Sequence, residues 1–324
     1  MGISMKEALD GFAIQLMEAK KLGRDIHLAG HFNRVVVCGM GGSGVPGDLL
    51  KAYASDMDVD VVKNYFIPRS VDKRTLMFLV SYSGNTEETL SCFRQGLRVG
   101  CQMVGISSGG KLQELCRQYR VPHVDVPKGY QPRIAYPLQL FPILNVLENL
   151  GLVSSAPDID EAVDLVKNAD FTGHARQLAA LLVGKLPIIY SSERMFGVAN
   201  RWRIAFLENC KIFAAVGVFP EIDHNELLAY ANPRLPFHVM ILHDEDDYRR
   251  IKDRMKLTKK LISRTAHVTE IRLSGKGRLA KIVSSIFLGD LISFYLAESM
   301  GVDPTDISLV EDFKKQLGSG YLSL

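Results

Sequence analysis

The fold is decided by residues 34–44, which read Arg34-Val35-Val36-Val37-Cys38-Gly39-Met40-Gly41-Gly42-Ser43-Gly44. The first five residues form a short β-branched run that is typical of a buried strand. The small residues that follow let the backbone approach an anion, and their free amides can donate hydrogen bonds to it. We therefore predict a strand that opens into an anion-binding loop, with Gly42 and Ser43 among the ligands.

Outward from this stretch, apolar runs of strand length alternate with amphipathic segments of helix length. The runs in the first half of the chain lie at residues 34–38, 59–63, 75–80, 102–106 and 122–126. Short β-branched runs separated by helix-length spans indicate a parallel sheet with helices on both faces. The first half is therefore predicted to be a doubly wound α/β domain.

A second set of elements follows the polar segment Ser154-Ser155-Ala156-Pro157-Asp158, which is typical of a linker. Strand-like runs then recur at residues 186–190, 237–242 and 267–273. The two halves look like versions of one architecture. We therefore predict two domains, at residues 1–153 and 154–324.

Another amphipathic helix is predicted at residues 308–317. Leu309, Phe313 and Leu317 recur there at a spacing of four, which places them on one helix face. We expect this face to form a buried seam.

The neighbouring residues distinguish the two lysines of this helix, Lys314 and Lys315. Lys315 follows Glu311 and Asp312 by about one turn, which is the pattern of a solvent-exposed charge pair. Lys314 instead has Val310 one turn before it and is predicted to border the apolar seam. Of the two, Lys314 is therefore the candidate for a functional role.

A second polar loop follows the apolar run at residues 76–80 and reads Ser81-Tyr82-Ser83-Gly84-Asn85-Thr86-Glu87-Glu88-Thr89. It places the hydroxyls of Ser81, Ser83 and Thr86 on a turn that opens a helix. Hydroxyls and helix N-terminal amides can together ligate a phosphate without a lysine. The alternative is that these residues only cap the helix. Three hydroxyls exceed what one cap needs, which favours phosphate binding.

The first glycine loop also matches the GxGxxG fingerprint of dinucleotide-binding proteins. That fingerprint requires an acidic residue at the end of the second strand to hold the ribose, whereas this chain has Lys63-Asn64 there. We therefore expect no nicotinamide cofactor. His27 and His31 are four residues apart, but no carboxylate or thiolate accompanies them, so no metal site is predicted.

Composition excludes several classes of protein. The chain has 39 basic and 36 acidic residues, which gives no basic stripe for nucleic acid. Five cysteines without a CxxC pair suggest free thiols in a reducing compartment. Residues 1–21 are amphipathic rather than signal-like, and no uninterrupted apolar run is long enough to span a membrane. We expect a cytoplasmic protein.

The two loops together resemble the sugar isomerase (SIS) fold, in which a GMGGSG loop is followed by SYSGNTEET. More closely, the chain is similar to the bifunctional phosphoglucose/phosphomannose isomerase family. The further motifs that carry this resemblance, in chain order, are Gly129-Tyr130-Gln131-Pro132-Arg133, Glu208-Asn209, Asp223-His224-Asn225-Glu226 and the lysine-bearing helix at residues 308–317. The resemblance implies two flavodoxin-like SIS domains and a final helix, with no cofactor.

The resemblance also implies a mechanism. Glu208 would be the base that moves a proton between C1 and C2 through a cis-enediolate, and Arg133 would stabilise the charge that develops. His224 and Lys314 would open the sugar ring. The family uses a histidine from the other subunit, which implies a homodimer in which His224 crosses the interface.

The implied reaction interconverts fructose 6-phosphate with glucose 6-phosphate and mannose 6-phosphate. Two alternatives remain open. The SIS fold also serves non-catalytic phosphosugar sensors, and it includes aminosugar-phosphate isomerases. A sensor needs the phosphate loop but not a base, an arginine and a lysine, so their joint presence favours an enzyme.

Overall fold

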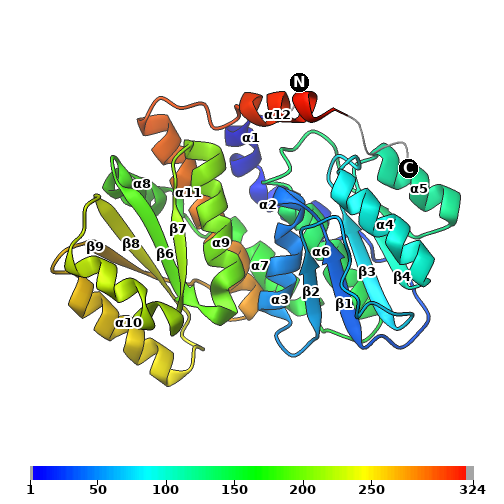
Figure 1. Cartoon of the computed structure of the whole chain (residues 1–324), viewed down its shortest axis with the longest axis horizontal. Coiled ribbons are helices and arrows are strands. Elements are labelled where there is room, and N and C mark those ends of the chain that lie inside the picture. The colour runs from blue at the N-terminus through cyan, green and yellow to red at the C-terminus, as the bar shows by residue number, and fades with distance from the viewer. Residues whose placement is uncertain (1–2, 319–324) are drawn as a thin grey trace. The chain divides into compact units, whose positions relative to one another are not determined.

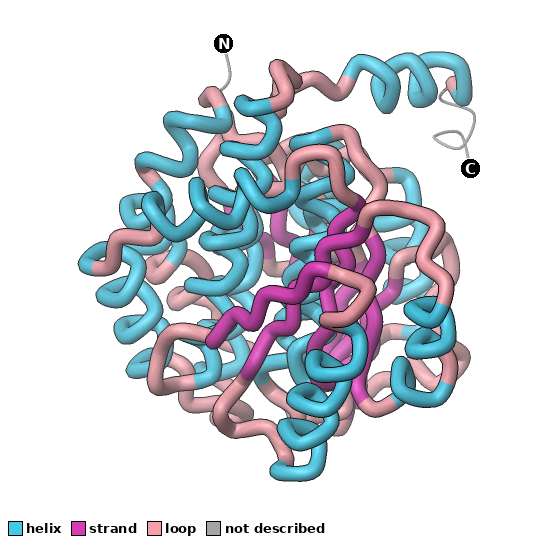
Figure 2. The backbone as a smooth tube through the Cα atoms, turned by 90° about the vertical axis from the view of Figure 1, so that its left-hand side faces the viewer, coloured by secondary structure: helices cyan, strands magenta, loops and turns pink. Residues whose placement is uncertain are grey.

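Parallel strands, paired into two separate sheets, form the framework of the chain (Figure 1). The computed structural model describes residues 3–318. Unit 1 comprises residues 3–160 and 306–318, and unit 2 comprises residues 161–305. Helices flank the strands, as the alternation of apolar runs predicts (Figure 2).

Unit 1 is built on a parallel sheet with the strand order β2-β1-β3-β4-β5. Its strands are β1 (Arg34–Cys38), β2 (Val59–Val62), β3 (Thr75–Val80), β4 (Gln102–Ser107) and β5 (His123–Asp125). Its helices are α1 (Met5–Asp10), α2 (Phe12–Ala19), α3 (Val45–Tyr53), α4 (Glu87–Val99), α5 (Gly110–Tyr119), α6 (Tyr136–Asn149) and α12 (Ser308–Leu317), with a 3₁₀ turn η1 (Gly41–Ser43). All strands predicted for the first half are confirmed.

Different helices cover the two faces of this sheet, because side chains alternate along each strand. Val36 shares one core with Phe93 of α4 and Leu112 of α5. Its neighbour Val37 points the other way, toward α3. There a Cβ added at Gly47 would lie 3.0 Å from the Val37 side chain. Unit 1 is therefore doubly wound.

Unit 2 has a parallel sheet with the order β7-β6-β8-β9. Its strands are β6 (Leu186–Ser192), β7 (Ala215–Phe219), β8 (Phe237–His243) and β9 (His267–Arg272). Its helices are α8 (Thr172–Leu182), α9 (Phe196–Ala205), α10 (Arg249–Ile262) and α11 (Arg278–Ser299), with 3₁₀ turns η2 (Glu193–Met195), η4 (Glu221–His224) and η5 (Glu226–Ala231) and a π-helix η3 (Phe206–Cys210). In both sheets the first strand lies between the second and the third, which confirms that the halves share one architecture.

Strand β7 is missing from the sequence prediction. It contains Gly217, and a glycine inside a strand lowers the strand signal. In the structure this glycine admits the ring of Tyr190, because a Cβ at Gly217 would lie 2.6 Å from the Tyr190 ring. The close approach to a residue far along the chain explains the glycine, and no local pattern shows it.

The division between the units falls within α7 (Ala156–Asn168), not at the predicted boundary after residue 153. The start of α7 belongs to unit 1, where Tyr53 donates a 2.6 Å hydrogen bond to Asp158. Glu161, one turn later, accepts a 2.9 Å bond from the backbone amide of Gly277 in unit 2. The polar stretch that suggests a linker therefore opens a helix shared by both units. The structure also groups α12 with unit 1, whereas the sequence assigns it to the second domain.

Helix α11 bears on the expectation that no uninterrupted apolar run is long enough to span a membrane, and its sequence is interrupted by Lys281 and Asp290. Among the described residues it is the helix that is long and apolar enough, by length and composition alone. However, 89% of its most apolar window is buried inside the structure. It packs along α8 and α9 and is the core helix of unit 2.

Candidate functional site

The two polar loops begin side by side at one edge of the unit 1 sheet. β1 and β3 are parallel neighbours, with Cys38 opposite Leu79, so both strands lead their loops to the same edge. The strand order reverses between these strands, since β2 lies beyond β1 and β4 lies beyond β3. Doubly wound sheets bind ligands in the crevice at such a switch point.

A third loop, which carries Arg133, joins the other two. Tyr82 in the second loop donates its amide to Ser43 Oγ of the first at 3.0 Å. Gly42 lies directly against the third loop, where an added Cβ would lie 2.7 Å from the backbone nitrogen of Arg133. The structure thus brings together all the predicted site residues of unit 1: Gly42, Ser43, Ser81, Ser83, Thr86 and Arg133.

The tyrosine of the second loop has a role that the sequence prediction missed. The Tyr82 hydroxyl donates to the Pro127 carbonyl at 2.8 Å and accepts from the Tyr130 amide at 2.9 Å. Burial raises the pKa of Tyr82, which keeps its hydroxyl protonated as a donor. The sequence pattern of hydroxyls before a helix does not reveal this role of Tyr82, because its partners Pro127 and Tyr130 lie more than forty residues later in the chain.

The hydroxyls of the second loop do not simply cap helix α4. Thr86 occupies the N-cap position but makes no side-chain capping bond. Its hydroxyl lies 2.8 Å from that of Ser81 instead, and Ser83 Oγ accepts from the Asn85 amide at 3.3 Å. The hydroxyls therefore bond within the loop, where Ser81 Oγ also accepts from the Thr86 amide at 3.4 Å. Ser83 is exposed and Ser81 is buried.

Gly84 gives this loop its shape. Its φ of +72° lies in the left-handed region that favours glycine. A Cβ at this position would also lie 1.8 Å from the Gly109 carbonyl oxygen. The loop therefore depends on glycine for both its conformation and its packing.

Arg133 is buried, although most loop arginines are solvated. Its exposed fraction is 3%. It sits in a tight turn in which the amides of Ile134 and Ala135 both bond the Gln131 carbonyl, just before α6 begins. Burial of a guanidinium is costly unless it is compensated, so the burial of Arg133 requires a reason beyond loop structure.

Glu208 lies in the π-helix η3, which the sequence prediction missed. The α-helix α9 ends at Ala205, and Phe206–Cys210 continue as a π-helix. Glu208 is half-buried, and its carbonyl accepts a 2.5 Å bond from Lys211 Nζ. π-turns inside helices are frequent at functional sites.

His224 lies in an exposed turn that is fixed by its flanking residues. Asp223 accepts from Arg254 Nη1 at 2.9 Å and from Thr258 Oγ1 at 2.8 Å, both on α10. On the other side, Glu226 accepts a 2.9 Å bond from the Tyr190 hydroxyl. Burial strongly raises the pKa of Tyr190, which keeps it a donor. Of the four residues of the motif, His224 and Asn225 are exposed, and Asp223 and Glu226 are half-buried.

Helix α12 forms as predicted, but its apolar seam is not buried. Leu309 is 83% exposed and Phe313 is 65% exposed. The expectation of a buried seam is wrong for the described chain, because no residue of α12 packs into a core there. Lys315 lies 3.6 Å from Asp312, which confirms the predicted charge pair.

The corresponding switch point of unit 2 differs in charge. The segment after β8 supplies Asp244 and Asp246, and both carboxylates accept from the ammonium of Lys281 on α11, at 2.7 and 2.6 Å. Burial disfavours the charged ammonium, but these bonds outweigh it and raise the pKa of Lys281. An acidic edge that already holds a cation is unsuited to phosphate.

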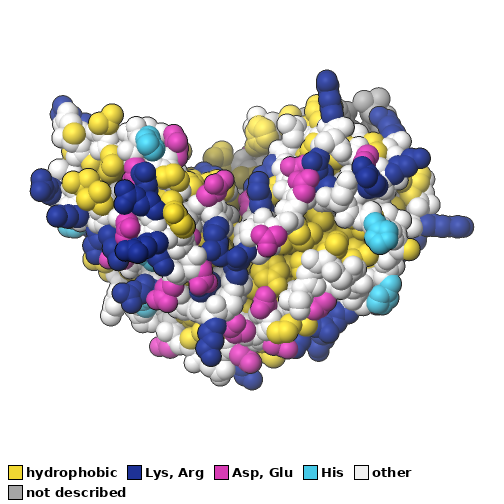
Figure 3. All heavy atoms as spheres, turned by 90° about the horizontal axis from the view of Figure 1, so that it is seen from below, with side chains coloured by type: hydrophobic (Ala, Val, Ile, Leu, Met, Phe, Trp, Pro, Cys, Tyr) yellow, Lys and Arg dark blue, Asp and Glu magenta, His cyan; other side chains and the backbone are white. Residues whose placement is uncertain are grey.

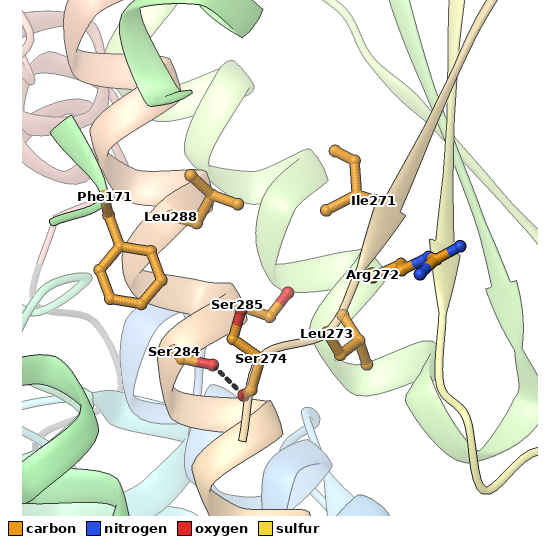
Figure 4. A pocket seen from close by; sticks show the side chains of 8 residues that line it. All are labelled: Phe171, Ile271, Arg272, Leu273, Ser274, Ser284, Ser285 and Leu288. Atoms are coloured by element: carbon orange, nitrogen blue, oxygen red, sulfur yellow. Dashed lines mark hydrogen bonds between the residues drawn. The ribbon is translucent and has the colours of Figure 1, made fainter. Parts of the chain in front are cut away.

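A small pocket in unit 2 contains none of the predicted site residues (Figure 4). It lies between β9, the segment that follows it, Phe171 and α11, where Ser284 Oγ donates to the Ser274 carbonyl at 2.7 Å. Its cavity of about 10 Å³ has room for roughly one water molecule. It is too small for a sugar phosphate.

The surface of each unit and the end of β2 carry charged side chains of both signs. Basic and acidic side chains are interspersed over the face of each unit that Figure 3 shows. Lys63 bonds Asp48 at the end of β2, where a dinucleotide-binding protein has its ribose acid. Among residues 3–318, no three His, Cys, Asp or Glu side chains gather as a metal site would require.

Comparison with known proteins places these features in a family. Residues 171–317 match the family model of the bacterial phospho-glucose isomerase C-terminal SIS domain. A bifunctional phosphoglucose/phosphomannose isomerase from Caldicellulosiruptor bescii is 34% identical, over 97% of this chain and 98% of its own. A D-glucosamine-6-phosphate 4-epimerase from Sulfolobus acidocaldarius is 31% identical, over 65% of this chain and 68% of its own.

A solved structure supports the fold independently. The C-terminal domain of glucosamine-fructose-6-phosphate aminotransferase from Francisella tularensis is similar with a TM-score of 0.70. The match covers 92% of this chain and 96% of that chain, at 14% sequence identity. Likeness at this identity shows the fold alone, which is the predicted pair of SIS domains.

Proposed function

Because this chain belongs to the bifunctional phosphoglucose/phosphomannose isomerase family, we propose that it interconverts fructose 6-phosphate with glucose 6-phosphate and mannose 6-phosphate. The observation that carries the proposal is the switch point of unit 1. There the hydroxyl cluster and the glycine loop lie beside the backbone of the loop that carries the buried Arg133. This combination fits a substrate that carries one phosphate and passes through an anionic intermediate.

In this mechanism the phosphate binds to Ser81, Ser83 and Thr86, together with the loop backbone at Gly42 and Ser43. The start of α4 adds amides that favour an anion. Held in this way, the substrate no longer tumbles relative to the protein. Positioning of this kind can supply several kcal/mol of the barrier reduction, roughly 7–11 at its best.

The chemical step is a proton transfer between adjacent carbons. Glu208 removes the proton from C2 of the open-chain aldose, and the C1 carbonyl becomes an enediolate oxygen. The same carboxyl returns the proton to C1, while the proton of the C2 hydroxyl passes to O1, so that C2 becomes the ketone carbonyl. Arg133 stabilises the negative charge that exists only during this passage. Return of the proton to either face of C2 would account for both the glucose and the mannose product.

Ring opening precedes this step. We assign it to His224, whose turn is fixed while the imidazole is exposed, and to Lys314 on α12. In the proposed homodimer, His224 of the partner subunit serves each site. Phe213 and Leu228 are 84% and 78% exposed in unit 2, and such apolar side chains suit an interface. Sedimentation tests the dimer: a monomer with full activity would contradict it.

The proposed reaction is tested by supplying fructose 6-phosphate and coupling glucose 6-phosphate formation to a dehydrogenase. A second assay follows mannose 6-phosphate. Turnover of both substrates supports the proposal. Saturable binding without turnover would instead establish a phosphosugar sensor.

A second candidate is an enzyme that acts on aminosugar phosphates, which the epimerase relative favours. Glucosamine 6-phosphate in the same substrate panel separates the two. We expect its turnover to be far below that of fructose 6-phosphate. The reverse order would assign the site to aminosugars.

Replacement of Ser83 by alanine is expected to raise the KM for fructose 6-phosphate about 5- to 50-fold, because a hydrogen bond to a charged group contributes about 1.5–3 kcal/mol, less where solvent competes. Inhibition by inorganic phosphate should weaken in parallel. Ser55→Ala is the control, since Ser55 is an exposed serine of unit 1 outside the loops. An unchanged KM and an unchanged phosphate inhibition constant would remove Ser83 from the site.

Replacement of Lys314 by alanine is expected to lower kcat/KM at least about 10-fold, as loss of a general acid or base does. Lys315→Ala is the matched control on the same helix, because Lys315 pairs with Asp312 instead. It should leave kcat/KM within about 2-fold of wild type, since exposed ion pairs contribute little. Equal losses in the two variants would contradict the assignment of Lys314.

A further inference from the structure

The π-helix that carries Glu208 needs support from outside itself. In a π-turn each amide bonds five residues back, and such turns are rare because the α-helical register is normally preferred. Phe206–Cys210 adopt this geometry, and Lys211 then ends the helix in the left-handed conformation, with φ of 57°. The position of Glu208 therefore depends on what holds the two residues that follow it.

Ser293 of α11 holds both of them. Asn209 is fully buried, and its Nδ2 donates to Ser293 Oγ at 2.9 Å. Cys210 Sγ donates to the Ser293 carbonyl at 3.0 Å. Ser293 Oγ in turn donates to the Asp290 carbonyl one turn earlier, at 2.9 Å, which fixes the hydroxyl's orientation. One residue of α11 thus accepts from both residues that follow the glutamate.

Helix α11 is itself fixed against α9. Arg201 and Asp290 form a buried ion pair at 2.6 Å, and Trp202 Nε1 donates to the Ser285 carbonyl at 2.9 Å. A Cβ at Gly289 would lie 2.6 Å from the Trp202 ring, so the two helices approach closely. Ser293 is therefore a rigid point from which the π-turn is positioned.

We propose that Ser293 is a positioning residue for the isomerisation, which holds the Glu208 carboxylate where it can exchange the substrate proton. This rests on the proposed function, with Glu208 as the base. Ser293 is completely buried and does not touch substrate. Its effect is geometric, since a misplacement of about 1 Å can reduce a rate by roughly 10²-fold.

The test compares Ser293→Ala with Ser299→Ala. Each substitution removes a serine hydroxyl that donates to a carbonyl three residues earlier in α11, because Ser299 Oγ donates to the Leu296 carbonyl at 2.8 Å. Only Ser293→Ala also leaves Asn209 Nδ2 without its acceptor. Ser293→Ala should lower kcat about 10-fold or more, with KM and 5-phosphoarabinonate binding within about 2-fold of wild type. Ser299→Ala should leave kcat unchanged.

Isotope effects distinguish positioning from a loss of folded protein. kcat is measured per binding site, counted by 5-phosphoarabinonate stoichiometry. The primary isotope effect on kcat is measured with glucose 6-phosphate deuterated at C2. A displaced base slows the proton transfer selectively, so this isotope effect in Ser293→Ala should be at least as large as in wild type. Ser293→Thr retains the hydroxyl and should recover most of kcat.

Ser293→Cys covers the case in which the alanine variant fails to fold, because it keeps the volume but is a weak acceptor. Its kcat per site should lie between those of wild type and Ser293→Ala. If the wild type turns over fructose 6-phosphate and folded Ser293→Ala or Ser293→Cys has the same kcat, the positioning role is overturned. The proposed function then stands. A primary isotope effect on kcat that is smaller in Ser293→Ala than in wild type would also overturn the positioning role alone. If the wild type itself shows no turnover, the proposed function falls and this role falls with it.

Discussion

Replacement of Glu208 by glutamine is expected to lower kcat for fructose 6-phosphate by at least about 10²- to 10⁴-fold, the range typical of a lost general base. Glutamine keeps the shape and the hydrogen-bonding capacity of the side chain but cannot accept the proton. The π-turn should survive, because the bonds from Asn209 and Cys210 to Ser293 do not involve the Glu208 side chain.

Binding separates this loss from a damaged site. The enediolate mimic 5-phosphoarabinonate should bind to Glu208→Gln nearly as well as to wild type, because the phosphate loops and Arg133 are unchanged. Glu298→Gln, at an exposed position near the end of α11, is the control and should retain full kcat. Near wild-type turnover by purified Glu208→Gln would exclude this residue as the base.

Replacement of Arg133 by glutamine should lower kcat/KM by about 10²- to 10³-fold, as removal of a preorganised group that stabilises transition-state charge does. Here 5-phosphoarabinonate should lose affinity, because its carboxylate stands in for the enediolate oxygens. Inorganic phosphate should still inhibit, since Ser81, Ser83 and Thr86 remain. This pattern is the opposite of that expected for Glu208→Gln.

A charge-retaining variant guards against misfolding at this buried position. Arg133→Lys keeps the cation but loses the planar fork of the guanidinium, so its activity should lie between wild type and Arg133→Gln. Arg74→Gln, at an exposed arginine of unit 1, is the control. Equal affinity of Arg133→Gln and wild type for 5-phosphoarabinonate would show that Arg133 does not face the reacting carbons.

The sequence by itself determined the switch-point loops. The β-branched run of β1 and the run of β3 each end in small or hydroxyl residues, and these signals are local. Parallel strands then bring their carboxyl ends to one edge without further information. The helix α12 and the Lys315–Asp312 pair also follow from local spacing and are confirmed.

Tertiary structure alone decided the rest. Asn209 and Cys210 of the π-turn bond Ser293, more than eighty residues later, and Gly217 of strand β7 lies against Tyr190 and Ile222. The 3% exposure of Arg133 and the exposed seam of α12 likewise depend on which surfaces meet. Spacing along a chain fixes which side chains share a face, but burial and hydrogen-bond partners are set by contacts between segments far apart in sequence, and no local pattern encodes them.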